Sequence, residues 1–131
     1  MKLENQVCSL ELAKRLKELG VKQESYFYWD KTPMLLIGQR PEKFGCISAF
    51  TVAELGEMLP WYLMIDGKVH WLTQKYDDDG PWLNYDPERK EPGIGQPSAD
   101  ENDSEANIRA KMLIHLIENK LIQPTENGGG K

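Results

Sequence analysis

The sequence predicts an α+β domain in which five or six short strands form a small, mostly antiparallel sheet with three helices. Two observations carry this prediction. Near both ends of the chain apolar residues recur at helical spacing, and one more short helical segment lies between them. The runs between these segments are short, apolar or aromatic, and separated by Gly, Pro and Asp, as strands joined by turns are. We expect the C-terminal helix to pack across the sheet.

The first helix is predicted over residues 10–19. Ser9 precedes it as a favourable N-cap, because a serine hydroxyl accepts a hydrogen bond from a free amide of the first turn. Gly20 follows it, and glycine readily adopts the left-handed conformation that ends many helices. The apolar positions in between are three residues apart, at Leu10, Ala13, Leu16 and Leu19.

A second, shorter helix is predicted over residues 52–58. Thr51 and Glu54 have the spacing of a capping box. In that motif the threonine hydroxyl accepts from the glutamate amide, and the glutamate carboxylate accepts from the threonine amide. Pro60 disfavours helical geometry in the residue before it, so the helix should end there.

The clearest strand signal is a hairpin around Asp66-Gly67. This pair tolerates the positive φ angles of a two-residue type I′ turn, so strands at 61–65 and 68–76 should pair. Other apolar or aromatic runs, bounded by turn residues, predict strands at 26–29, 34–37, 46–50 and 82–85.

The last helix begins at Ser104 and carries a wide apolar stripe. The stripe consists of Ala106, Ala110, Leu113, Ile114, Ile117 and Leu121. Before this helix, residues 86–103 are rich in Pro, Gly and charge without a hydrophobic period, which predicts a long flexible loop. We expect a single domain over residues 1–122 and a disordered tail over 123–131.

The hairpin register also predicts which side chains share a face. One face carries two cross-strand pairs, Tyr62 with Trp71 and Met64 with Val69. We predict that this face is the inner one. The opposite face is also largely apolar, so either both faces are covered or one meets a partner. That second face carries Trp61, Leu63, Ile65, His70 and Leu72.

Aromatic residues are concentrated in residues 61–85, more densely than one small core needs. Three of the four tryptophans and three of the five tyrosines lie there. Aromatic side chains often anchor interfaces, so an exposed subset is the best candidate for a binding face. The candidate binding residues are Trp61, Trp71, Tyr76, Trp82 and Tyr85.

Composition narrows the classes of partner. The net charge of −5 argues against generic binding to nucleic acid, which needs clustered Lys and Arg. Lys14, Arg15 and Lys17 form a short basic strip on the first helix, but Glu11 and Glu18 interrupt it, so we interpret it as a solvated face. No apolar run reaches the length of a membrane span, and no signal peptide is evident, so we expect a soluble, cytoplasmic protein.

The residues for metal binding and catalysis are few. Cys8, Cys46, His70 and His115 are the only Cys and His residues, and they lack the close pairing of structural zinc ligands. We interpret both cysteines as buried free thiols. Cys46 with His70 is the least implausible nucleophile and base, and nothing else supports that pair. We therefore expect no metal, no cofactor and no catalytic residue.

Three blocks of the chain resemble small uncharacterised proteins of phages, prophages and related mobile elements. The blocks are residues 8–21 (CSLELAKRLKELGV), 49–60 (AFTVAELGEMLP) and 109–122 (RAKMLIHLIENKLI). The resemblance implies a mobile-element setting. It implies no activity, because that family has none to carry over.

These observations predict a non-catalytic accessory protein that binds another protein, or a second copy of itself, through the aromatic hairpin. Its acidic charge would favour a basic partner. The alternative is a small-molecule-binding protein or enzyme whose pocket lies under the 86–103 loop, with that loop as a lid.

Overall fold

The computed structural model describes residues 5–32, 34–37, 45–77, 80–87 and 104–123. Within them the chain is α+β, as predicted. In chain order the elements are α1 (Leu10–Glu18), β1 (Phe27–Trp29), β2 (Leu35–Ile37), β3 (Ile47–Ser48), α2 (Val52–Met58), β4 (Tyr62–Ile65), β5 (Lys68–Asp77), β6 (Gly80–Pro87) and α3 (Glu105–Glu118).

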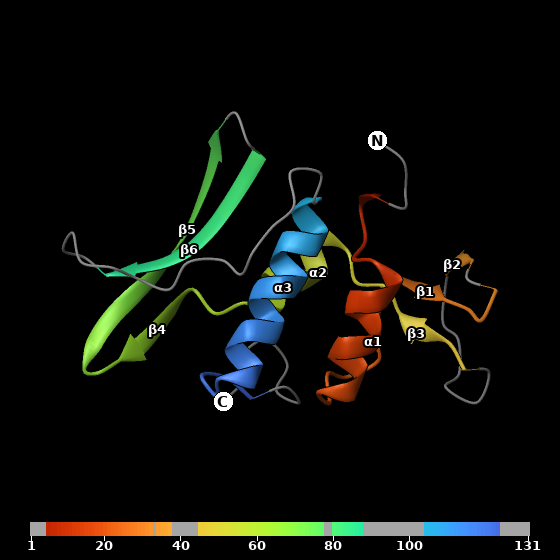
Figure 1. Ribbon diagram of the computed structural model, residues 1–131, viewed down its shortest axis with the longest axis horizontal. Helices are drawn as coiled ribbons and strands as arrows, with labels where there is room; N and C mark the ends of the chain where they lie inside the picture. Colours follow the sequence, from red (N-terminus) through yellow and green to blue (C-terminus); the bar gives the residue numbers. More distant parts are fainter. Residues whose placement is uncertain (1–4, 33, 38–44, 78–79, 88–103, 124–131) are drawn as a thin grey trace.

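The six strands divide between two antiparallel sheets of three strands each, in the orders β2-β1-β3 and β4-β5-β6. Figure 1 shows the helices between the sheets, with β4, β5 and β6 on one side and β1, β2 and β3 on the other. The second helix separates β3 from β4 along the chain. The sheet that contains the predicted hairpin therefore forms one end of the molecule.

A side-chain cap begins each of the three helices, as predicted for the first two; the third cap is Ser104, where the last helix was predicted to begin. Ser9 accepts from the Leu12 amide at 3.3 Å, and Ser104 accepts from the Asn107 amide at 3.1 Å. At α2 the complete capping box is present: Thr51 Oγ1 accepts from the Glu54 amide at 3.1 Å, and Glu54 Oε1 accepts from the Thr51 amide at 2.9 Å. Each cap satisfies amides that have no partner inside the helix.

The C-terminal helix α3 is the centre of the fold. Eight of its fourteen residues are buried, on more than one side of the helix, because it packs against α1, α2 and β6 together. Figure 1 shows α3 between α1 and the β4-β5-β6 sheet. The predicted packing of this helix across the sheet is thus confirmed. None of the helices in the described ranges combines the length and the apolar character that a transmembrane span requires.

The β4–β5 hairpin has the predicted turn and register. Asp66 and Gly67 have φ angles of 52° and 78°, which suit a type I′ turn. Tyr62 pairs with Trp71 across the strands, and Met64 pairs with Val69.

The predicted inner face of this hairpin is wrong. Tyr62, Met64 and Trp71 are exposed, whereas the opposite face packs against the core, apart from Trp61 at its start, which is exposed. The third strand explains the choice: in the β5–β6 register Leu72 faces Tyr85 and Gln74 faces Leu83, so the large buried side chains of β6 share the face of Leu72. The inner face contains Leu63, Ile65, His70, Leu72, Leu83 and Tyr85.

Candidate functional site

Four large apolar side chains are exposed on the β4–β5 hairpin. We call these exposed side chains, those of Trp61, Tyr62, Met64 and Trp71, the aromatic face. They are 83%, 51%, 58% and 45% exposed, respectively. Tyr62, Met64 and Trp71 lie on the outer side of the sheet, and Trp61 comes directly before β4. Large apolar residues that gather on a surface in this way usually mark a site of interaction.

Tyr62 and Trp71 form a fixed aromatic pair in this face. Their ring centroids are 5.8 Å apart and their planes are tilted by 52°. The Leu72 amide donates to the Trp61 carbonyl at 2.8 Å, so the adjoining pair, Tyr62 and Trp71, is of the non-hydrogen-bonded kind. Side chains approach each other more closely in such pairs, and tilted rings at this distance attract each other. Tyr62 and Trp71 therefore present their rings in a set orientation.

The inner face fixes this hairpin to the rest of the fold. The Tyr85 hydroxyl donates to the Pro60 carbonyl at 2.7 Å, immediately before the hairpin begins. Burial raises the pKa of Tyr85, so its hydroxyl keeps the proton that it donates. Gln74 of β5 donates to Glu105 at 2.7 Å and accepts from Arg109 at 2.9 Å, and both partners belong to α3. These bonds orient the aromatic face away from the helices.

The structure separates the predicted binding residues. Trp61 and Trp71 lie in the aromatic face, but Tyr85 is fully buried in the core and is left out of it. The side chains of Tyr76 and Trp82 lie outside the described part of the chain.

Sequence reasoning missed Tyr62 and Met64 as surface residues. It placed them on the inner face, because both faces of the hairpin read as apolar. The signal that identifies them is the alternation of side chains along β6, which puts Leu83 and Tyr85 on the opposite face of the sheet.

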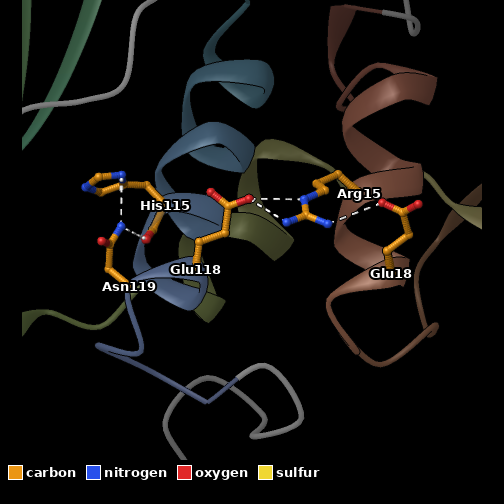
Figure 2. Close-up of polar contacts among 5 residues, drawn as sticks. All are labelled: Arg15, Glu18, His115, Glu118 and Asn119. Carbon is orange, nitrogen blue, oxygen red and sulfur yellow. Dashed lines mark hydrogen bonds and ion pairs between the residues drawn. The ribbon is translucent and has the colours of Figure 1, made fainter.

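Each of the two histidines has a polar contact with a residue near it in the chain. His70 is buried on the inner face, with Nδ1 3.2 Å from the Lys68 carbonyl oxygen. His115 of α3 lies beside Asn119, whose amide nitrogen is 3.3 Å from His115 Nδ1 and donates to the His115 carbonyl at 2.8 Å (Figure 2). Cys46 directly precedes β3 of the β2-β1-β3 sheet, whereas His70 belongs to β5 of the other sheet, beyond the helices, so the structure does not bring this pair together.

Both cysteines are buried and free. Burial raises the pKa of Cys8 to about 11, which keeps it a neutral thiol near pH 7. Such a thiol is a poor nucleophile and a poor metal ligand. In the part of the chain that the structure describes, no three residues among His, Cys, Asp and Glu gather as metal ligands would.

Arg15, the central residue of the basic strip on α1, is engaged with acidic residues. Arg15 donates to Glu118 of α3 through Nε at 3.1 Å and Nη2 at 2.6 Å, and its Nη1 lies 3.4 Å from Glu18 (Figure 2). A guanidinium held by two carboxylates offers little net charge to a phosphate. The aromatic face is therefore the better candidate for binding.

Comparisons with protein-family models, with curated proteins and with solved structures find no match to this chain. The resemblance to mobile-element proteins thus stays a prediction. Asp86 and Pro87, the first two residues of the predicted 86–103 loop, belong to β6. Residues 88–103 lie outside the described residues, so the predicted pocket under that loop also stays a prediction.

Proposed function

We propose that this protein is a non-catalytic binding module that engages a protein partner through the aromatic face. The observation that carries the proposal is the exposure of Tyr62, Met64 and Trp71 on the outer face of one hairpin, with Trp61 exposed directly before β4, while the inner face of the sheet is packed. Tyr62, Met64 and Trp71 together expose roughly 300 Å² on that outer face. This area is in the range of the largest apolar patch on a typical monomer, and such patches often bind partners.

The residue types favour a protein as the partner. Tyr, Trp and Met are enriched in protein interfaces, and truncation of a buried interface Trp or Tyr commonly costs much of the affinity. The Tyr62–Trp71 pair is already oriented before binding. Little conformational entropy is then lost when a partner covers it.

Charge adds a preference for basic partners. Asp86 of β6 lies opposite Trp71 in the sheet register, so its carboxylate is on the same side as the aromatic face. The chain as a whole carries a net charge of −5. A basic residue at the rim of the partner would pair with this carboxylate and speed the encounter.

The proposed setting is a phage or other mobile element, where the protein would be an accessory factor. This part of the proposal depends on the resemblance of residues 8–21, 49–60 and 109–122 to small proteins of such elements. It concerns the setting alone and assigns no chemistry.

The test is capture of partners from a lysate of the cells that make the protein, with Trp71→Ala compared with wild type. Tyr26→Ala is the matched control, because Tyr26 is 70% exposed and adjoins β1, at the other end of the molecule. We expect Trp71→Ala to lower recovery of the partner at least about tenfold, as loss of an interface anchor does, and Tyr26→Ala to leave it unchanged. Equal recovery by all three proteins would contradict the proposal.

A further inference from the structure

We propose that the edge strand β4 pairs with β4 of a second copy, which would join two three-stranded sheets into one of six strands. This goes beyond the proposed function, because edge pairing leaves the outer side of the joined sheet available to another protein. Three features of β4 carry the inference: its place in the sheet, the direction of its backbone groups, and its sequence.

β4 is the edge of its sheet, and exposure is greatest along it. The strand order is β4-β5-β6, so among the described residues only β5 pairs with β4. Trp61, Tyr62 and Met64, at or in β4, are each more exposed than Trp71 on the central strand. The uncovered surface is thus concentrated where another strand would lie.

The backbone of β4 has groups that point away from β5. In an antiparallel ladder the pairs alternate between hydrogen-bonded and non-hydrogen-bonded. The bond from the Leu72 amide to the Trp61 carbonyl shows that Trp61 and Leu72 are a hydrogen-bonded pair. Two residues further on, Leu63 is therefore in such a pair too and directs its amide and carbonyl toward β5. Tyr62 and Met64 direct theirs outward, as a template for a further strand.

β4 lacks the residue types that proteins use to protect sheet edges. Its sequence, Tyr-Leu-Met-Ile, contains no charge and no proline. Lysine, proline and inward-pointing charges are common means of preventing edge pairing, and a very short strand is another. Of these, β4 has only its short length of four residues, so its backbone groups stay open to pairing over that length.

The outward groups are complementary to themselves in one register. A two-fold axis beside Leu63 places Tyr62 of each copy opposite Met64 of the other. Each of these two pairs exchanges two backbone hydrogen bonds, so that four form in all. This axis also keeps the outer side chains of both copies on one side of the joined sheet. Moving the axis to Tyr62 would set Met64 against Pro60, which has no amide hydrogen, and moving it to Met64 would set Tyr62 against Asp66 of the turn.

The register is tested by disulfide trapping between two variants, Tyr62→Cys and Met64→Cys. Opposite positions on neighbouring strands come within disulfide range, whereas 62 and 62, or 64 and 64, lie about two residues out of step. The native thiols of Cys8 and Cys46 are buried and should not interfere. We expect an equal mixture of the two variants to give several-fold more covalent dimer under mild oxidation than either variant alone. No excess in the mixture would overturn the inference.

Self-association is measured in parallel by sedimentation over a range of concentrations. Met64→Pro removes an amide hydrogen that points away from β5, so it should abolish the dimer, whereas Met64→Ala keeps the amide and should retain it in part. Wild-type protein that stays monomeric at the highest concentration would overturn the inference. If Trp71→Ala loses partner capture while the wild-type protein stays monomeric, the proposed function stands and only the pairing of two copies is refuted.

Discussion

Two tyrosines of the same sheet, Tyr62 and Tyr85, have opposite roles because they occupy opposite faces. Tyr85 is fully buried and donates to the Pro60 carbonyl at 2.7 Å. Tyr62 is half exposed and packs against Trp71. A tyrosine serves either purpose, since its ring is apolar and its hydroxyl is polar. Residue type alone therefore does not separate core from surface here.

The difference predicts unequal effects on stability. Tyr85→Phe removes the donor and leaves a carbonyl without its partner, which should lower the free energy of unfolding by about 1–3 kcal/mol. Trp61→Ala removes a side chain that is mostly in solvent, so we expect a change within about 0.5 kcal/mol. Chemical denaturation of the two variants checks the order. If Trp61→Ala proved the more damaging, Trp61 would belong to the core.

At the scale of elements, local signals predicted most of the secondary structure. The predicted α2, residues 52–58, has the observed bounds, because capping and the following proline act within a few residues. The hairpin turn and register were also local and are confirmed. The division into two sheets was not predictable in this way, since pairing of β1 with β3 depends on residues far apart in sequence.

The candidate site was predicted only in part for the same reason. Trp61 and Trp71 were found by composition, but the exposure of Tyr62 and Met64 follows from packing of β6 and α3 behind the hairpin. Alternation along a strand gives two faces without saying which one is inside. When both faces are apolar, the buried residues of the third strand show which face is the inner one.

The capping box of α2 predicts a graded mutational effect. Thr51→Ala removes the hydroxyl that accepts from the Glu54 amide at 3.1 Å, and we expect a loss of about 1 kcal/mol in the free energy of unfolding. Thr51→Ser keeps the hydroxyl and is the control. Thermal or urea unfolding measures both. An equal loss in the two variants would show that the threonine methyl group, rather than the cap, is responsible.

At the scale of the whole molecule, the helices separate two sheets, and large apolar side chains are exposed in or beside each of them. The β4-β5-β6 sheet is fixed to α3 by its inner face and presents the aromatic face outward. The other sheet contacts α1 through β3 and has its own exposed residues near it, among them Tyr26 and Met34. The molecule thus contains an internal control for any claim about the aromatic face.

Because exposed residues at the other sheet serve as a control, binding through the aromatic face is tested most directly by oxidative labelling. The protein is labelled alone and in its captured complex, and the labels are read by mass spectrometry. Met64 and Met34 are a matched pair, 58% and 62% exposed at opposite ends of the molecule. If the aromatic face binds the partner, labelling of Met64, Trp61 and Trp71 should fall severalfold in the complex, and labelling of Met34 should not change. Protection of Met34 with Met64 still labelled would contradict the proposed function.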